Sequence, residues 1–224
     1  MRRFLRDNGL SLSFGAIFLG TLALQSLAGW KDYNEELLAH EDAPIAYGRY
    51  LYSSEFGAAV MENWQSEYLQ FFLFILATIW LLQRGSNESK ELDKAGLESD
   101  QEQRVGKWAG PKSPKAARTK NLLFHLYANS LLLVMGAIFL ASWFAESVTS
   151  WTVFNAEQID HRQSAVGWDK YLTTPDFWEK SLQNWQSEFL AVGTMAIFTV
   201  YLRQRGSPES KPVGAPHEET ASSG

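Results

Sequence analysis

The sequence Asn63-Trp64-Gln65-Ser66-Glu67 occurs twice in this chain, the second time as Asn184-Trp185-Gln186-Ser187-Glu188. The likeness extends outward from this motif in both directions, so that residues 5–90 align with residues 126–211 at a constant offset of 121 and without a gap. Of the 86 aligned positions 32 are identical, against a chance rate of roughly 6% for ordinary composition. The chain is therefore an internal duplication, and both copies are expected to adopt the same fold.

Each copy contains two apolar stretches, which the mean hydropathy of -0.21 conceals because the charged residues lie between them. The first pair covers residues 9–28 and 122–144, and the second pair covers residues 64–82 and 185–202. Helices of about 20 residues cross a hydrocarbon core of roughly 30 Å. The sequence thus predicts an all-α, four-helix integral membrane protein, built from two helical hairpins of the same orientation with a small exterior cap. Arg2, Arg3 and Arg6 before the first stretch resemble a signal peptide, but the same stretch recurs inside the chain, which favours a membrane span.

The basic residues predict the orientation. The N-terminus, the segment between the copies and the C-terminal tail carry fifteen Lys and Arg, whereas the two loops inside the hairpins carry five. Cytoplasmic segments of membrane proteins are enriched in Lys and Arg. We therefore expect both termini in the cytoplasm, a first repeat over residues 1–90, a cytoplasmic linker over 91–120, a second repeat over 121–211 and a disordered cytoplasmic tail over 212–224.

The second helix of each hairpin has recognisable start and stop signals. Ser53 and Thr174 occupy equivalent positions and are good N-cap residues, with Pro175 at the favoured first helical position. At the other end, Arg84 and Arg205 are expected in the last turn, followed by Gly85 and Gly206 as C-cap glycines. A helix of this length, about 45 Å, would protrude from the bilayer, and residues 30–53 and 151–174 would cover it as exterior loops.

The repeated motif supplies the strongest candidate for a polar or ion site. Asn63 and Glu67 lie four residues apart and share a helical face, as do Asn184 and Glu188. Carboxylates inside a membrane are functional candidates by default, although these two could equally remain among the lipid headgroups. Trp64 and Trp185 are placed to act as interfacial anchors.

Two further sets of residues recur at equivalent positions. His40, His161, Glu36 and Glu157 could form an exterior metal site, because histidine and glutamate both bind zinc and similar ions, although their spacing matches no ligand motif. Ala16 and Gly20, with Ala137 and Ala141 in the second copy, have the small-residue spacing that lets helices approach closely in lipid. This packing could occur within one chain or between two copies of it.

Several classes of function lack any signal. The chain has no cysteine, which excludes disulfides, thiolate metal sites and a cysteine nucleophile. No phosphate loop, dinucleotide fingerprint, serine-hydrolase elbow or zinc helix occurs. We therefore expect no enzyme activity, no cofactor and no nucleic-acid partner.

With its duplicated Asn-Trp-Gln-Ser-Glu and Gln-Arg-Gly-Ser motifs, the chain resembles a family of bacterial membrane proteins known only as a domain of unknown function. The resemblance covers nearly the whole chain apart from the linker and the tail. It implies a location in the bacterial inner membrane, and it brings no activity, cofactor or catalytic residue.

The sequence leaves three hypotheses for function. The first is a non-enzymatic structural or scaffold component of the membrane that self-associates. The second is a small cation or proton transporter or channel that uses Glu67 and Glu188. The third is an exterior metal-binding or membrane-enzyme site around His40 and His161.

Overall fold

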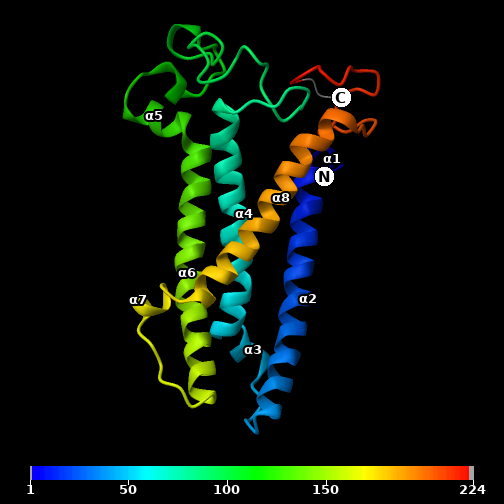
Figure 1. Ribbon diagram of the computed structural model, residues 1–224. Helices are drawn as coiled ribbons and strands as arrows, with labels where there is room; N and C mark the ends of the chain where they lie inside the picture. The colour runs from blue at the N-terminus through cyan, green and yellow to red at the C-terminus, as the bar shows by residue number, and fades with distance from the viewer. Residues whose placement is uncertain (1, 222–224) are drawn as a thin grey trace. The chain divides into compact units, whose positions relative to one another are not determined.

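A computed structural model describes residues 2–221 of the chain (Figure 1). These residues form helices and turns but no strand. The all-α class is therefore as predicted. The α-helices are α1 (Arg2–Asp7), α2 (Gly9–Ala39), α3 (Tyr47–Tyr50), α4 (Ser54–Trp80), α5 (Leu122–Ala128), α6 (Ser130–Asp160), α7 (Trp168–Tyr171) and α8 (Pro175–Tyr201). Two short 3-10 helices, η1 (Gly106–Trp108) and η2 (Lys115–Arg118), lie between α4 and α5.

The chain forms two compact units that do not follow the boundaries of the repeat. The first unit contains the residues up to Val60 together with Ser147–Val166, and the second contains Met61–Glu146 and the residues from Gly167 onward. The boundaries fall within α4 and α6, so each of these two helices contributes to both units.

The element bounds repeat at the same offset as the sequence. Helices α2 and α6 have 31 residues each, α3 and α7 have four, and α4 and α8 have 27. Even the break before each long helix recurs. The Asn8 side chain donates to Phe4 O over 2.9 Å, and Asn129 at the equivalent position donates to His125 O over 2.8 Å. Each side-chain amide thus donates a hydrogen bond to a backbone carbonyl at the point where the helix is interrupted.

The first helix of each hairpin is longer than predicted. Residues 30–39 were expected in an exterior loop, but they continue α2, and residues 151–160 likewise continue α6. Each helix is about 46 Å long and ends in a tight turn with a left-handed residue, Glu41 at φ 65° and Arg162 at φ 60°. Both segments continue as helix because neither contains a proline or glycine that would stop it.

In the first unit, a polar clamp attaches the returning chain to the end of α2. Trp30 Nε1 donates to Ile45 O over 2.8 Å, and the Asn34 amide both donates to this carbonyl over 3.1 Å and accepts from Ile45 N–H over 2.8 Å. Ser26 and Tyr47 join their hydroxyl groups over 2.7 Å nearby. The backbone N–H and carbonyl of Ile45, in the irregular segment after α2, thereby find hydrogen-bond partners in side chains of α2.

The same clamp recurs at the end of α6, also in the first unit. Trp151 Nε1 and Asn155 Nδ2 donate to Val166 O over 2.8 and 3.0 Å, and Val166 N–H donates to Asn155 Oδ1 over 2.9 Å. The start of α4 packs closely against this part of α6, since a Cβ atom on Gly57 would lie 2.9 Å from Thr149. Close packing at this position therefore requires glycine.

The predicted N-caps of α4 and α8 are confirmed. Ser53 Oγ accepts from Phe56 N–H over 3.2 Å, and Thr174 Oγ1 accepts from Phe177 N–H over 3.4 Å. Pro175 occupies the first turn of α8, where its missing N–H is not needed.

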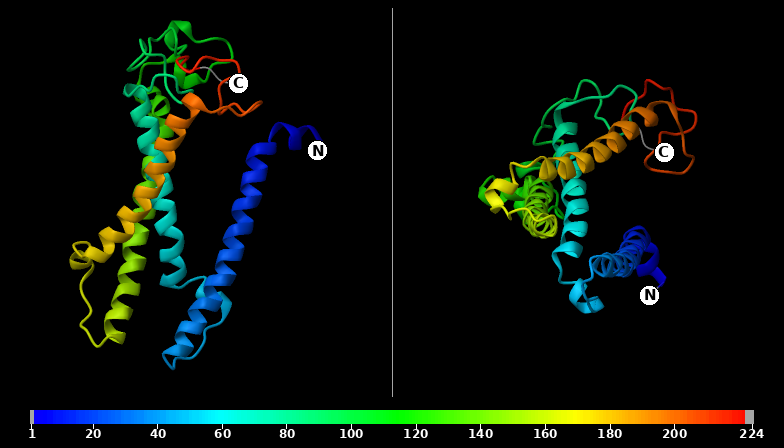
Figure 2. Two further views of the ribbon diagram at one scale, coloured as in Figure 1. Left: turned by 45° about the vertical axis from the view of Figure 1, so that its right-hand side comes forward. Right: turned by 60° about the horizontal axis from the view of Figure 1, so that its bottom comes forward.

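In the second unit, α8 runs diagonally across α4, and α6 lies beside α4 (Figures 1 and 2). Gly136 permits the close approach of α6 and α4, because a Cβ atom there would lie 3.0 Å from the Phe72 ring. Tyr171 is completely buried, packs edge-on against Phe177 and donates to Asp176 over 3.1 Å. Short helix α7 is thereby fixed to the first turns of α8.

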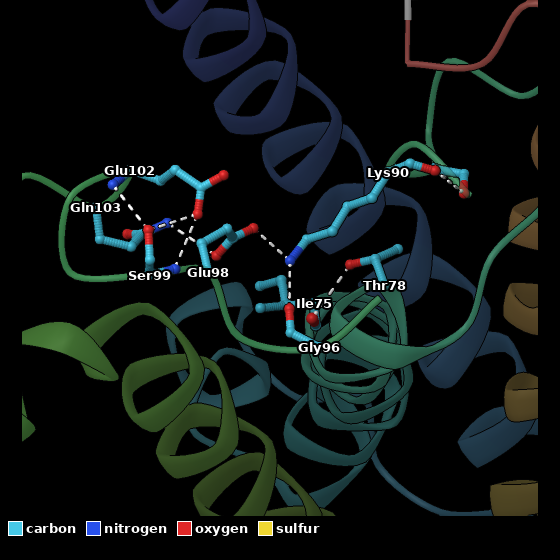
Figure 3. Close-up of polar contacts among 9 residues, drawn as sticks. Ile75, Thr78, Lys90, Gly96, Glu98, Ser99, Glu102 and Gln103 are labelled. Atoms are coloured by element: carbon cyan, nitrogen blue, oxygen red, sulfur yellow. Dashed lines mark hydrogen bonds and ion pairs between the residues drawn. The ribbon is translucent and has the colours of Figure 1, made fainter. Parts of the chain in front are cut away.

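The beginning of the linker is held by an ion pair and by hydrogen bonds. The Lys90 ammonium contacts the Glu98 carboxylate and donates to Gly96 O over 2.8 Å (Figure 3). Gly96 N–H in turn bonds to Ile79 O over 2.7 Å, so the linker folds back onto the end of α4. Polar residues that look solvated in the sequence are used here for internal hydrogen bonds.

Two helices, α2 and α6, are long and apolar enough to cross a membrane, as judged by length and composition among the described residues. Of their most apolar stretches, only 6% and 17% respectively are buried inside the protein. A core helix of a soluble protein would be mostly buried. Helices α4 and α8 were predicted as spans too, and for these the prediction stays open, since polar motif residues occupy part of each helix.

Candidate functional site

The two copies of the Asn-Trp-Gln-Ser-Glu motif lie against each other in the second unit. Trp185 Nε1 donates to Gln65 Oε1 over 2.6 Å, and Asn184 Nδ2 donates to Glu62 Oε1 over 2.8 Å. Gln65 is completely buried. Helices α4 and α8 therefore meet through hydrogen bonds between large polar side chains, which makes their relative position specific.

Further along the same pair of helices, the carboxylates of Glu67 and Glu188 interact electrostatically. Glu188 is half-buried and Glu67 is exposed. The structure thus brings one carboxylate of each copy near the other, while Asn184 donates to Glu62 instead of joining them.

Trp185, which was predicted as an interfacial anchor, packs against aromatic rings of α6. Its ring lies 5.7 Å from that of Trp143 and 6.4 Å from that of Phe139, measured between centroids. Trp143 also stacks on Phe177 and donates to Ser181 Oγ over 3.3 Å. These aromatic contacts attach α8 to α6. Trp64, the equivalent residue of α4, is half-buried.

A buried acidic group next to these aromatic rings was missed by the sequence reasoning. Glu146 on α6 is completely buried, and its charged neighbours are Glu62, Lys180 and Asp176. Lys180 forms an ion pair of 3.1 Å with Asp176 and supplies the positive charge of this group. Burial of a carboxyl group is costly without such compensation.

The signal for this acidic group was present where the two copies differ. Glu146 aligns with Gln25, and Lys180 aligns with Ala59. A search restricted to identical positions therefore overlooks both residues, although a charge gained in an apolar context is a recognised functional signal.

The repeated Gln-Arg-Gly-Ser-x-Glu-Ser-Lys sequence forms the same turn after each of the two helices. Helices α4 and α8 end at Trp80 and Tyr201, so the expected arginines of the last turn, Arg84 and Arg205, lie beyond the helix. Gly85 and Gly206 are left-handed, at φ 82° and 84°, but they belong to this turn and are not C-caps. The glycines do not cap the helices because the chain becomes extended directly after each helix, as at Leu202 with ψ 157°.

The serines of this sequence explain its recurrence. Ser89 Oγ accepts from Gln83 N–H over 2.9 Å, and Ser210 Oγ accepts from Gln204 N–H over the same distance. Both serines are buried. Each one therefore satisfies the N–H of a residue in the extended segment that follows the helix.

The lysines that follow organise the segments after them. Lys211 is almost completely buried, and its ammonium donates to the carbonyl groups of Pro216, His217 and Glu219 over 2.9–3.1 Å. The tail was expected to be disordered from residue 212 on. Residues 212–221 instead form turns around this ammonium, and residues 222–224 lie outside the described part of the chain.

The residues of the possible exterior metal site lie at helix ends. Glu36 and His40 are at the end of α2, and Glu157 and His161 are at the end of α6. Among residues 2–221, no group of three or more His, Cys, Asp or Glu side chains is arranged to hold a metal ion.

The small residues with membrane-packing spacing all lie on exposed helix surface. These are Ala16 and Gly20 on α2, and Ala137 and Ala141 on α6. The close approach inside the second unit uses Gly136 instead.

The fold defines an all-helical protein with two helices long and apolar enough to cross a membrane. The chain belongs to the family described as Domain of unknown function (DUF6766), which it matches over residues 1–222. No match was found among curated proteins or among solved structures.

Proposed function

We propose that the chain is a multi-pass protein of the bacterial inner membrane with four spans, and that it serves as a non-enzymatic scaffold component. The observation that carries this proposal is the apolar surface of α2 and α6, of which so little is covered by the protein itself. Such a surface is stable in hydrocarbon and unstable in water. The polar contacts of α4 with α8 support a rigid, specific assembly and bring no reaction chemistry.

The four-span part of this proposal is tested by measuring on which side of the membrane three loop residues lie. If four helices cross, residues 41 and 163 lie on the exterior and residue 113 lies in the cytoplasm. If only α2 and α6 cross, residue 41 stays outside, but residue 113 moves to the exterior and residue 163 to the cytoplasm. The absence of native cysteine allows single reporter cysteines without further changes to the chain.

We would introduce Glu41→Cys, Ser113→Cys and Gln163→Cys separately and treat intact cells with a maleimide that does not cross membranes. The four-span proposal expects labelling of residues 41 and 163 in intact cells, and of residue 113 only after permeabilisation. Labelling of residue 113 in intact cells, with protection of residue 163, would refute it and establish two spans. Labelling of all three after permeabilisation is the control for accessibility.

A second function, proton or cation transport, is favoured by one observation. Glu67 on α4 and Glu188 on α8 interact electrostatically, and Glu62 on α4 lies near the buried Glu146. Carboxylates arranged along a helix pair are typical of proton and cation paths. Because four helices seldom enclose a pore, a transporting form would be an oligomer.

Transport is tested with purified protein in liposomes that report internal pH. The conducting hypothesis expects a proton or cation leak from the wild type that is lost in the Glu67→Gln/Glu188→Gln double variant and kept in Glu179→Gln, an exposed change on α8. No flux from the folded wild type would leave the scaffold as the function.

A further inference from the structure

A cavity of about 280 Å³, open to the surface, lies between α4 and α8 in the second unit and has both apolar and acidic lining. Its wall is apolar and includes Phe71, Phe74, Val192 and Met195. Its polar lining includes the carboxyl groups of Glu88 and Glu209. A second cavity of about 210 Å³ shares Phe74 and Glu88 with the first. Apolar pockets with a few converging polar groups are the usual form of a small-molecule site.

The two carboxyl groups converge because the repeated turn positions them. Ser86 Oγ accepts from Glu88 N–H over 3.1 Å, and Ser207 Oγ accepts from Glu209 N–H over 3.2 Å. The Ser86 hydroxyl also forms a hydrogen bond of 3.1 Å with the Thr199 hydroxyl, which connects the turn after α4 to α8. The Glu88 and Glu209 side chains share a hydrogen bond, and burial together with the charge of Glu209 raises the pKa of Glu88.

The lining determines which chemical class fits. It contains two carboxyl groups and no Lys or Arg, so it favours a positively charged group. An inorganic divalent cation needs about six oxygen ligands, and the remaining wall is mainly apolar. Rings of Phe71 and Phe74 interact favourably with organic cations and with apolar groups.

We propose that this cavity binds a small ammonium compound with an apolar body, its cationic group held between Glu88 and Glu209. The apolar body occupies the space lined by the phenylalanines, Val192 and Met195. The ammonium group takes the place of the hydrogen bond between the two side chains. The same chemistry is offered by a free amine and by the ethanolamine headgroup of a lipid.

The test uses the full chain in a neutral detergent and benzyltrimethylammonium as the probe, with binding measured by calorimetry. Its uncharged isostere neopentylbenzene is the matched ligand. The proposal expects at least tenfold weaker binding of the isostere to the wild type. It also expects at least tenfold weaker binding of the ammonium probe to the Glu88→Gln/Glu209→Gln variant, but unchanged binding to Glu218→Gln, which alters an exposed tail carboxylate.

Two further readouts separate binding from nonspecific effects. The affinity of the wild type should fall as the pH is lowered, because a protonated Glu88 no longer attracts the ammonium group, and the double variant should lose this dependence. Should the double variant not fold, Ala191→Phe fills the cavity while keeping both carboxylates and should abolish binding. Equal affinity of the folded double variant and the wild type would overturn the proposal, as would full binding by Ala191→Phe.

The source of the ammonium group is resolved in nanodiscs of an uncharged glycolipid. Addition of phosphatidylethanolamine should weaken binding of the probe if the lipid headgroup is the natural occupant. Unchanged probe binding with this lipid present assigns the cavity to a free ammonium compound. Failure of the probe to bind in either nanodisc, as in detergent, contradicts the proposal.

Discussion

Asn34 and Asn155 each hold an irregular segment of backbone through two hydrogen bonds. Replacement of either by alanine leaves the backbone N–H of Ile45 or Val166 without its partner, which costs about 1–3 kcal/mol, while the carbonyl keeps its bond from the tryptophan. We therefore expect Asn155→Ala to lower the free energy of unfolding by this amount, measured by denaturant titration in detergent. Gln163→Ala changes an exposed side chain nearby and should have almost no effect. Equal stability of the two variants would contradict the role of the clamp.

Gly29 is required on α2 because the Tyr50 hydroxyl occupies the place of a side chain. We expect Gly29→Ala to destabilise the protein by about 1–3 kcal/mol through overpacking. Thermal unfolding should show the loss, and the second change Tyr50→Phe should restore part of it. Gly20 on the same helix has no neighbour within 4 Å. Gly20→Ala should therefore be neutral or stabilise the helix by about 0.5–1 kcal/mol, and a loss similar to that of Gly29→Ala would argue against a steric cause.

The raised pKa of Glu88 makes the stability of the free protein depend on pH. A carboxyl group whose pKa is raised in the folded state contributes stability below its unfolded value of 4.5, and this is lost as the pH rises through the folded value. We expect the melting temperature of the wild type to fall relative to that of Glu88→Gln as the pH is increased from about 4 to about 8. The Glu209→Gln variant should show a smaller difference, because it lacks the neighbouring charge. A difference that is constant over this range would refute the effect.

At the scale of single elements, the start of α8 depends on one hydroxyl group. Thr174 Oγ1 accepts from Phe177 N–H, and Phe177 is itself buried. We expect Thr174→Ala to cost about 0.5–2 kcal/mol of stability and Thr174→Ser to restore most of it. Thr173→Ala removes an exposed hydroxyl one residue earlier and is the control. Chemical unfolding followed by circular dichroism measures all three, and a serine variant as unstable as the alanine variant would exclude capping.

Helix starts were more predictable than helix ends. Ser53 and Thr174 were recognised as N-caps because capping depends on local backbone and one side chain. The ends of α2 and α6 were placed too early, because the apolar stretches end before the helices do. The ends of α4 and α8 were placed too late, since Ser89 and Ser210 satisfy the backbone from outside the helix.

At the scale of the whole molecule, the tail is held by Lys211 and by contacts with the turn after α4. Thr220 Oγ1 accepts from Gly85 N–H over 2.9 Å, and Ala221 N–H donates to Ser86 O over 3.1 Å. Lys211→Met removes three hydrogen bonds, so we expect the tail to detach and become sensitive to a glutamate-specific protease. Lys112→Met, an exposed change in the linker, should keep the tail resistant. Equal cleavage rates in both variants would contradict this role.

The sequence by itself determined the all-α class, the duplication and the N-caps of the second helices. These are set by local propensity, by hydrophobic periodicity and by comparison of one copy with the other. Only the tertiary structure decided that Trp185 bonds to Gln65, that Glu146 is buried near Lys180, and that Glu88 meets Glu209 over a cavity. The physical reason is that such contacts depend on the angle at which α8 crosses α4 and on turns stabilised from a distance, neither of which is encoded in a run of neighbouring residues.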